Sequence, residues 1–534
     1  MKEMTGGEAV VECLLTHKIE TLFCLPGIQN DWFFNALFDH GQKIRVIHTR
    51  HEQGAGYMAL GYALASGKVG MYSVVPGPGF LNSSAALATA YALNAKVFCL
   101  TGQIPSAAIG REQGVLHEIN NQLEVLRTLS KWADRAESPS DIARLFSEGI
   151  RQMHSGMPRP VGLEIPMDVL QQKAVVDFSS PFPPVYNPPL DENLIEQAAQ
   201  LLGDSENPMI FVGSGAQDVS EEITKLAEML QAPVVAYRTG KGILDARHYL
   251  SLQQPPAEKY WQKADVVLSV GSNMRIPAQK WAKQHRPKII RIDVDPRSHM
   301  KFLKPEIAIT VRAEDALGPL LESLASVGRI RSSRESELKE LRAWWDQSVS
   351  ILEPQLAFLK VIREELGDDG IFVDELTQVG FASRITWPAY HPRTYISTGY
   401  QGTLGYGFPT AIGVKVARPD RLVVSIAGDG GFLFNAQELA TAVQQQIPVI
   451  ILLFNNNQYG NVQQMQKNDY GGRVIATDLL NPDFVKLAES FGAQAFRAKS
   501  PEDVRHAIRA GASVNVPTLV EIPVGDMPSA DRFR

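Results

Sequence analysis

Short apolar runs alternate with stretches of helical spacing along most of the 534-residue chain. The pattern is clearest in the last third, where the apolar runs 421–427 and 449–454 flank a segment, 434–446, with Leu439 and Val443 one helical turn apart. This order predicts strand, helix and strand. In such a βαβ unit the strands run parallel, and their polar carboxyl-terminal loops lie at one edge of the sheet, where ligands bind.

The same alternation divides the chain into three parts. The first part has strand-like runs at 21–27, 44–49, 69–75 and 97–102 and helix-like stretches at 6–19, 51–67 and 82–95. The middle part has strand-like runs at 208–216, 232–242, 264–272 and 287–296. The last part continues the pattern at 371–380, 395–409, 421–431, 449–460 and 517–525. Repeated βα alternation predicts an α/β fold with three doubly wound parallel-sheet domains.

Two polar segments mark the expected domain boundaries. Residues 178–191 are dense in proline, which is typical of a linker, and residues 331–355 form a charged helical stretch. We therefore expect a first domain at 1–177, a middle domain at 192–330 and a third domain at 356–534. A chain of this length is too long for one hydrophobic core, and three domains agree with the usual domain size.

Composition narrows the class of protein. The formal net charge is only −6 and the apolar content is 44%, so nothing in the charge favours a nucleic-acid partner or an acidic membrane surface. Cys13, Cys24 and Cys99 stand among apolar residues, which favours buried free thiols in a reducing compartment. The N-terminus lacks a secretory signal pattern, and no apolar stretch is long enough to span a bilayer. We expect a cytoplasmic protein.

Candidate chemistry gathers at the sheet edge that carries Asp429. This carboxylate follows one predicted strand, and the amide of Asn456 follows the next. With a backbone carbonyl one turn later, these oxygens suit Mg²⁺ or Ca²⁺, and Mg²⁺ commonly shares such a shell with phosphate oxygens. Gly430 and Gly431 let backbone N–H groups approach an anion, and the helix expected from about residue 435 directs its positive end the same way.

Each of these motifs also has a simpler explanation. Gly-Asp-Gly alone is more typical of a tight turn, but Asp429 together with the following helix, strand and asparagines favours a diphosphate site. Glu52 stands at the start of a predicted helix, where an acidic residue stabilises the helix dipole whatever its function. The glycine-rich segments 76–79 and 399–409 are, by themselves, ordinary turns and loops.

The combination of these motifs resembles one enzyme family. GDGGF at 428–432 with NN at 455–456, RHEQGA at 50–55 and PGPG at 76–79 are similar to the motifs of thiamine diphosphate (ThDP) enzymes, in the group of acetolactate synthase, benzoylformate decarboxylase and pyruvate decarboxylase. The resemblance covers nearly the whole chain and is closest to acetolactate synthase large subunits. It implies pyrimidine-binding, middle and diphosphate-binding domains in that order, ThDP and Mg²⁺ as cofactors, and active sites formed between two chains of a homodimer or homotetramer.

The resemblance also implies roles for single residues. The Mg²⁺ ligands would be Asp429, the side chain of Asn456 and the main-chain oxygen of Gln458. Glu52 would share a proton with N1′ of the cofactor's pyrimidine ring and so promote loss of the C2 proton. Further cofactor contacts are expected from Pro76, Thr377, Gln378, Gly402, Leu404, Gly428, Gly430 and Gly431. Among these, Leu404 would wedge between the two cofactor rings, and the Gly402 carbonyl would accept a hydrogen bond from the 4′-amino group.

The substrate side is less clearly marked. Leu116-His117-Glu118 stands where the synthases carry Phe-Gln-Glu over the thiazolium, and His117 would either exchange protons there or lie on the loop surface. Gln29 and Asn30, in the turn after the first strand, would bind a substrate carboxylate or carbonyl or simply form the turn. Met465 replaces the tryptophan that selects the larger acceptor in typical synthases.

These features together predict ThDP- and Mg²⁺-dependent decarboxylation of a small-molecule 2-oxo acid, with ligation to a second carbonyl. The alternatives are simple decarboxylation of a larger 2-oxo acid, of the benzoylformate type, and an acyloin or 2-hydroxyacyl lyase. A non-catalytic assembly partner belongs to another class, and the presence of Glu52 and Asp429 argues against it. The middle domain lacks the G-x-G-x-x-G fingerprint, and residues 272–281 replace the family's aspartate pair, so we expect no bound FAD.

Overall fold

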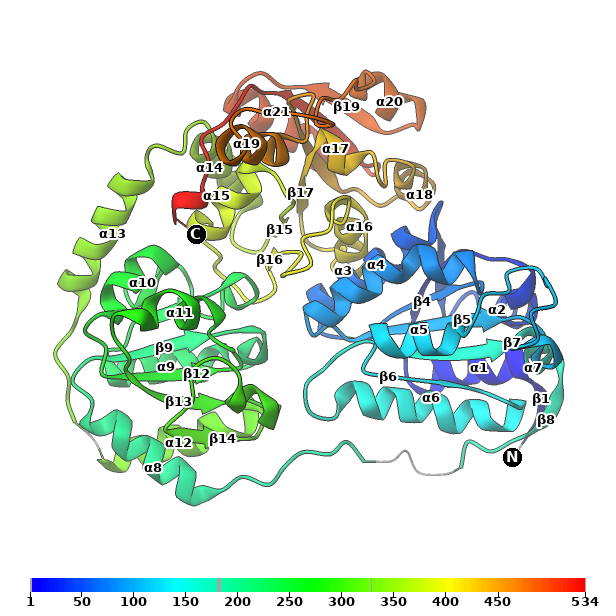
Figure 1. Ribbon diagram of the computed structural model, residues 1–534, viewed down its shortest axis with the longest axis horizontal. Coiled ribbons are helices and arrows are strands. Elements are labelled where there is room, and N and C mark those ends of the chain that lie inside the picture. The colour runs from blue at the N-terminus through cyan, green and yellow to red at the C-terminus, as the bar shows by residue number, and fades with distance from the viewer. Residues whose placement is uncertain (1, 180–183, 328, 534) are drawn as a thin grey trace. The chain divides into compact units, whose positions relative to one another are not determined.

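The computed structural model describes residues 2–179, 184–327 and 329–533. Three six-stranded parallel sheets with helices around them form the fold (Figure 1), which confirms the predicted α/β class with three parallel-sheet domains. Residues 180–183 of the expected linker lie outside the described residues. No helix in the described part of the chain is both long and apolar enough to cross a membrane.

The first sheet has the strand order β3-β2-β4-β5-β7-β6. Its strands are β2 (Thr21–Cys24), β3 (Arg45–His48), β4 (Gly70–Val74), β5 (Val97–Gln103), β6 (Trp132–Arg135) and β7 (Val161–Pro166). Its helices are α1 (Gly6–Thr16), α2 (Asp31–Phe38), α3 (Glu52–Ser66), α4 (Pro78–Ala92), α5 (Gln122–Leu129), α6 (Pro139–His154) and α7 (Met167–Gln171). An antiparallel pair, β1 (Lys2–Thr5) and β8 (Lys173–Val176), joins the two ends of this domain.

The middle sheet has the order β11-β10-β9-β12-β13-β14. Its strands are β9 (Pro208–Val212), β10 (Val234–Ala236), β11 (Ser251–Leu252), β12 (Val266–Val270), β13 (Lys288–Ile292) and β14 (Ile307–Ile309). Its helices are α8 (Glu192–Asp204), α9 (Ser220–Leu230), α10 (Gln254–Trp261), α11 (Arg275–Gln279) and α12 (Ala313–Val327). Four of these strands match the predicted runs, and the two- and three-residue strands β11 and β14 are additions.

The third sheet has the order β16-β15-β17-β18-β20-β19. Its strands are β15 (Ile371–Val373), β16 (Tyr395–Ile396), β17 (Val423–Gly428), β18 (Ile450–Asn455), β19 (Gln494–Arg497) and β20 (Thr518–Pro523). The helices of this part are α13 (Glu335–Val349), α14 (Gln355–Leu366), α15 (Gln378–Thr386), α16 (Gly407–Ala417), α17 (Asp429–Phe432), α18 (Glu438–Gln444), α19 (Gly460–Asp469), α20 (Phe484–Ser490) and α21 (Pro501–Ala512). The helix expected from about residue 435 is present as the short helix α18, which begins at Glu438, and α17 lies before the expected segment.

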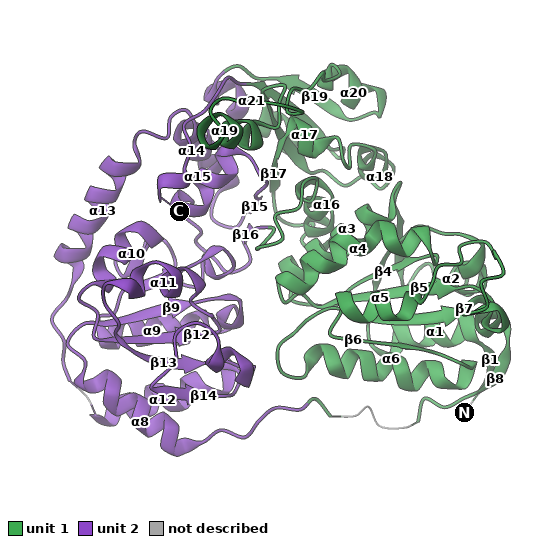
Figure 2. Cartoon of the chain, in the orientation of Figure 1, with its two compact units in different colours: residues 1–185, 398–499, 506–523 green, residues 186–397, 500–505, 524–534 purple. Residues whose placement is uncertain are grey.

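The chain divides into two compact units (Figure 2). The first comprises residues 1–185, 398–499 and 506–523, and the second comprises 186–397, 500–505 and 524–534. Unit 1 thus contains the whole first sheet together with β17, β18, β19 and β20, while unit 2 contains the middle sheet, β15 and β16. Glu52 and Asp429 both belong to unit 1.

Inside unit 1, α3 of the first sheet packs directly against α16. The helices approach so closely that a Cβ on Gly61 would collide with the backbone carbonyl of Thr410, and a Cβ on Gly413 would collide with that of Met58. Only glycine permits such a backbone contact. The small-residue helix predicted from the sequence therefore serves as a packing surface, and it fixes the helix that begins with Glu52.

The predicted state of the cysteines is confirmed. Cys13, Cys24 and Cys99 are buried and unpaired. Burial raises the pKa of the Cys24 and Cys99 thiols to about 12, so both stay protonated and inert.

Candidate cofactor-binding and active site

Glu52 is the first residue of α3, placed by β3 and by the cap at His51, whose ring accepts a hydrogen bond from the Gln53 N–H. The carboxylate is half-buried, and its Oε2 accepts a hydrogen bond of 3.0 Å from Nδ2 of Asn82 on α4. The other oxygen, Oε1, lies beside Gly79, where an added Cβ would sit 3.4 Å from it. One oxygen of Glu52 is thus fixed, and the other lies against the glycine turn.

Contacts with His117 and Gln122 fix the turn that contains Pro76 and Gly77. Gly77 has a φ of +60°, and a Cβ there would collide with the backbone oxygen of His117. Its N–H donates a hydrogen bond of 2.7 Å to Oε1 of Gln122. A non-glycine residue would be strained at this φ and would push away the loop that carries His117.

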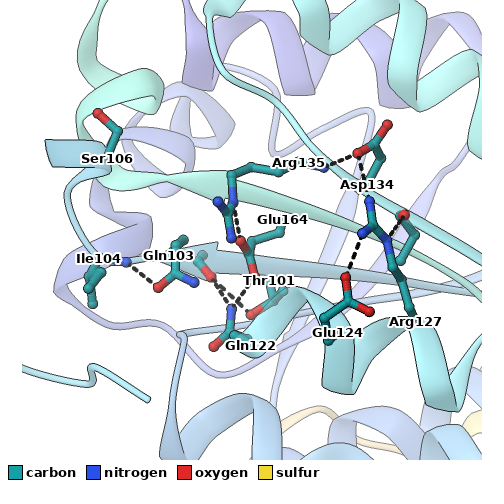
Figure 3. Close-up of polar contacts among 12 residues, drawn as sticks. Thr101, Gln103, Ile104, Ser106, Gln122, Glu124, Arg127, Asp134, Arg135 and Glu164 are labelled. Atoms are coloured by element: carbon teal, nitrogen blue, oxygen red, sulfur yellow. Dashed lines mark hydrogen bonds and ion pairs between the residues drawn. The ribbon is translucent and has the colours of Figure 1, made fainter. Parts of the chain in front are cut away.

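Gln122 is itself part of a buried network (Figure 3). Its Nε2 donates to the Gly102 carbonyl at 3.0 Å and to Oε2 of Glu164 at 2.9 Å, and Glu164 forms an ion pair with Arg135. Glu164 is fully buried, and Gln122 is 1% exposed. The sequence reasoning missed these three residues because they lie on different elements, and no spacing pattern connects them.

Gln29 and Asn30 form the short 3₁₀ turn Ile28–Asn30 after β2. Each donates a side-chain N–H to a backbone carbonyl: Gln29 donates to that of Leu116 at 3.2 Å, and Asn30 donates to that of Val74 at 2.9 Å. Both residues are buried, and Gln29 Oε1 and Asn30 Oδ1 have no hydrogen-bond partner among the described atoms. The structure therefore places Gln29 against the loop that carries His117.

His117 lies on the loop between β5 and α5, with a φ of +71°. Its Nδ1 is buried without a hydrogen-bond partner among the described atoms. An imidazole nitrogen in that state has a hydrogen bond left to form with a ligand. The ring is half-buried as a whole, and its exchange of protons with a substrate stays a prediction.

Asp429 is the first residue of α17 and directly follows β17. It is 2% exposed, and burial raises the pKa of its carboxyl group. Hydrogen bonds from Asn481 and from the backbone N–H groups of Gly430 and Gln458 oppose that rise. The Asn481 bond, from Nδ2 to Oδ2, measures 2.7 Å.

The asparagine run ends β18. Asn455 Nδ2 donates to Oε1 of buried Glu521 at 2.9 Å, while its Oδ1 accepts from Asn481 at 3.0 Å. Asn456 lies next to Gly460, where an added Cβ would sit 2.7 Å from its Nδ2. The backbone N–H of Gln458 therefore contacts the Asp429 carboxylate, and so does the side chain of Asn481. The sequence pattern gave no indication of Asn481.

The donor set fits a hard cation. In the described part of the chain no three His, Cys, Asp or Glu side chains gather as a metal site would require. Of the expected ligands, Asp429 brings the one carboxylate, while Asn456 and the Gln458 carbonyl would bring neutral oxygens; the amide oxygens of Asn455 and Asn457 accept instead from Asn481 Nδ2, at 3.0 and 3.2 Å. One charge with neutral oxygens suits Mg²⁺ shared with phosphate.

The loop before α16 carries Gly402 and Leu404. Gly402 has a φ of +59°, and its N–H donates to Thr398 Oγ1 at 3.0 Å. The neighbouring Gly405 carbonyl accepts a hydrogen bond of 2.7 Å from Asn435, which fixes the loop against the segment that follows Asp429. Leu404 is half-buried, so a bulky apolar side chain is available at the place expected for the wedge.

The other expected cofactor contacts fall in two places. Gly428 ends β17 and Gly430 packs on the ring of Tyr459, where a Cβ would not fit, and Gly431 follows it in α17. Thr377 and Gln378 belong to unit 2. There the Thr377 hydroxyl accepts the Gly380 N–H at 2.9 Å and so caps α15, which Gln378 begins.

A further carboxyl group, missed from the sequence, lies next to the start of α3. Glu438 on α18 is fully buried, and both its oxygens accept the Arg50 N–H at 3.2 Å, while Thr441 donates to Oε2 at 2.6 Å. Burial raises the pKa of Glu438 to about 7. Gly54 leaves room for this carboxyl group, since a Cβ there would lie 2.5 Å from Oε1.

Comparison with known families identifies the domains that carry these residues. Family models described as "Thiamine pyrophosphate enzyme" match the chain as an N-terminal TPP binding domain over residues 4–125, a central domain over 195–320 and a C-terminal TPP binding domain over 377–522. The N- and C-terminal matches contain Glu52 and Asp429.

Individual relatives are similar over nearly the whole chain. A probable acetolactate synthase large subunit of Methanocaldococcus jannaschii is 33% identical, over 98% of this chain and 92% of the relative. A probable 2-ketoarginine decarboxylase of Pseudomonas aeruginosa is also 33% identical, over 98% of this chain and 94% of the relative. The acetolactate synthase large subunit of Corynebacterium glutamicum is 31% identical, over 98% and 87%.

Proposed function

The chain belongs to the thiamine pyrophosphate enzyme family, and we propose that it decarboxylates a 2-oxo acid with ThDP and Mg²⁺ and ligates the product to a second carbonyl compound. The observation that carries the proposal is the placement of Glu52, with one oxygen held by Asn82 and the other beside the glycine turn. Similarity to acetolactate synthases over 98% of the chain supports the ligation step.

In this proposal ThDP, when bound, supplies a carbon nucleophile and takes up the electron pair that CO₂ leaves behind. Glu52 would hold a proton at N1′ of the pyrimidine ring, oriented by Asn82. Pro76 and Leu404 would limit the positions open to the two rings. Gln29, through its Oε1, would orient the substrate, and His117, through its buried Nδ1, would exchange protons with it.

The diphosphate end would be held in the third domain. Asp429, Asn456 and the Gln458 carbonyl would bind Mg²⁺, and the N–H groups of α17, starting at Gly430, would bind diphosphate oxygen. The remaining predicted contacts are expected to surround the cofactor from the same loops, or from the loop before α15: Gly402, Gly428, Gly431, Thr377 and Gln378.

Decarboxylation without ligation is the second candidate. The 2-ketoarginine decarboxylase is as similar to the chain as the synthases are. Met465, at the expected acceptor position on α19, is 50% exposed and less bulky than tryptophan. An acyloin or 2-hydroxyacyl lyase is the third candidate, since it would use the same carbon–carbon bond chemistry in reverse.

A panel of 2-oxo acids tests these proposals. Each acid is assayed for CO₂, aldehyde and acetolactate, with and without ThDP and Mg²⁺. Acetolactate from pyruvate supports the first candidate, and aldehyde alone from a larger acid supports the second. Glu52→Gln should lower kcat by about 10²–10⁴-fold with either product, since it removes the proton donor at N1′. Wild-type turnover in this variant would refute the mechanism.

The remaining expectations concern assembly and the middle domain. We propose a cytoplasmic homodimer or homotetramer without bound FAD. In the middle domain, Gly213 and Gly215 pack directly on Gly271, so these glycines serve backbone packing. Light scattering of the purified protein tests the assembly, and the visible absorption spectrum tests for flavin.

A further inference from the structure

An unbroken chain of hydrogen bonds crosses the strand ends of the third sheet and stops at Asp429. Arg497 Nε donates to Glu521 Oε2 at 2.9 Å, and Asn455 Nδ2 donates to Glu521 Oε1 at 2.9 Å. Asn481 Nδ2 then donates to Asn455 Oδ1 at 3.0 Å and to Asp429 Oδ2 at 2.7 Å. We call these five residues the strand-end network; all belong to unit 1.

The direction of this network is fixed by its charged members. Arginine can only donate and an ionised carboxylate can only accept, so Glu521 must receive N–H groups from both neighbours. Asn455 therefore turns its nitrogen to Glu521 and its oxygen to Asn481. Asn481 in turn must offer its nitrogen, and the same nitrogen group reaches Asp429. The direction of the hydrogen bonds that starts at Arg497 thus places an N–H donor against the Asp429 carboxylate at the other end of the network.

Burial makes it costly to reverse the direction of these hydrogen bonds. Glu521 is 4% exposed, Asn455 8% and Asp429 2%. A buried polar group that loses its partner bears the full cost of its lost hydration. Asn481 itself is held in place because it precedes Asp483, which caps α20 and contacts Arg497 at 3.2 Å. Both ends of the network therefore anchor the Asn481 segment.

We propose that Asn481 is a positioning residue for the cation of the diphosphate site. Its amide N–H donates to one carboxylate oxygen of Asp429 and so fixes the orientation in which the carboxylate meets the cation. Arg497, Glu521 and Asn455 keep the nitrogen of the Asn481 amide, and not its oxygen, directed at Asp429. This inference rests on the proposed function, in which Asp429 binds Mg²⁺. Asn481 acts through Asp429 and takes no part in the chemistry of the substrate.

The first test is Asn481→Leu, which keeps the shape of the side chain and removes the donor. Mg²⁺ is titrated calorimetrically into protein saturated with ThDP. We expect Mg²⁺ to bind about 10–100-fold more weakly, the usual loss when the partner of a metal ligand is removed. At saturating Mg²⁺, kcat should stay within a few-fold of wild type. Asn468→Leu, an exposed asparagine on the preceding helix, is the matched control and should leave the Mg²⁺ Kd unchanged.

The second test changes the network without touching the cation site. In Glu521→Gln, the amide oxygen can still accept from Arg497, but its nitrogen then faces Asn455. The Asn455 amide cannot simply reverse, because its Oδ1 also accepts the Asn457 backbone N–H at 3.1 Å. Two N–H donors then face each other at residues 521 and 455, which displaces the Asn455 amide that receives Asn481. We expect Mg²⁺ binding to weaken in this variant too. If Asn481→Leu does not fold, the Glu521→Gln result decides.

The outcomes are separable. Wild-type Mg²⁺ affinity in Asn481→Leu or in folded Glu521→Gln overturns the proposal. So does a collapse of kcat at saturating Mg²⁺ with an unchanged Kd, because Asn481 would then act in catalysis. If the wild-type protein binds neither ThDP nor Mg²⁺, the proposed function itself has failed, and the variants are not at fault.

Discussion

Asn82 is the side chain that fixes the carboxylate of Glu52. A hydrogen bond to a charged group contributes about 1.5–3 kcal/mol, and much of that is lost when the donor is removed. We expect Asn82→Leu to lower kcat by about 10–100-fold at saturating ThDP, Mg²⁺ and substrate, because Glu52 then samples other orientations. Steady-state kinetics with an acid that the wild type accepts measures the effect.

The control for that variant lies on the same helix. The Ser84 hydroxyl bonds to the Leu81 carbonyl within α4, so Ser84→Ala should leave kcat unchanged. If Asn82→Leu keeps the wild-type kcat while its structure is intact, the contact between Asn82 and Glu52 has no part in turnover.

Glu438 predicts a pH dependence of stability. Burial raises the pKa of Glu438 from 4.5 to about 7, so the folded protein binds this proton more tightly than the unfolded chain does. The stabilisation is complete below pH 4.5 and is lost as the pH rises through about 7. The groups facing this carboxyl are the backbone N–H of Arg50 and His51, the Arg50 guanidinium and the Thr441 hydroxyl.

Glu438→Gln removes that titration and keeps the size of the side chain. Relative to this variant, the wild type should lose about 3 kcal/mol of unfolding free energy between pH about 5 and about 8, at 1.36 kcal/mol per unit of pKa shift. Denaturant unfolding of both proteins across this range measures the difference. Parallel pH profiles for the two proteins would contradict the assignment.

Single residues also show where sequence reasoning ended. Glu52 and Asp429 have local signals, a helix start and a Gly-Asp-Gly turn, from which both can be proposed as site residues. Their partners have none, since Asn82 lies 30 residues from Glu52 and Asn481 lies 52 residues from Asp429. A polar contact formed by folding leaves no spacing in the chain.

Among the elements, α18 shows how a tertiary contact overrides helical spacing. The segment 434–446 has the apolar pattern of one helix, but regular helix begins only at Glu438. The side chain of Asn435 donates to the Gly405 carbonyl at 2.7 Å and to Gln53 Oε1 at 3.0 Å. These two bonds hold the chain in a turn before α18 and attach it to the Leu404 loop and to α3.

Gln122 is the first residue of α5, and its side chain is expected to affect both stability and ThDP binding. Gln122→Leu would leave two buried groups without a partner, the Gly77 N–H and one oxygen of Glu164. It would also remove one of the donors to the Gly102 carbonyl, which accepts from Thr101 Oγ1 as well. At about 1–3 kcal/mol each, the unfolding free energy should fall by several kcal/mol, and ThDP should bind more weakly because the Gly77 turn is released. Thermal unfolding and ThDP titration measure the two effects.

An exposed residue on the same helix is the control for Gln122. Glu124 pairs with Arg127 at the surface, where such a pair contributes little, so Glu124→Gln should change neither stability nor ThDP affinity. Equal ThDP affinity in Gln122→Leu and the wild type would show that the network in Figure 3 supports the fold alone.

For the whole molecule, the sheets were the most predictable feature. Strands such as β5, β12 and β18 are fully buried apolar runs, and burial on both faces of a parallel sheet demands that composition. The short edge strands β11, β14 and β16 have two or three residues each, too few to show a period. Their place depends on pairing with a neighbour that the local sequence does not specify.

Cofactor binding should be visible in the stability of the whole protein. A ligand that binds only the folded state, at about 100 times its Kd, stabilises it by about 2.7 kcal/mol. We expect ThDP with Mg²⁺ to raise the melting temperature and ThDP with a chelator to raise it less, because in the proposed site Asp429 and Gln458 would hold the diphosphate only through the cation. FAD should produce no shift, since the middle-domain glycines are occupied by their own backbone contacts. A shift with FAD but none with ThDP and Mg²⁺ would place the cofactor in the middle sheet and refute both the diphosphate site and the role of Asn481 within it.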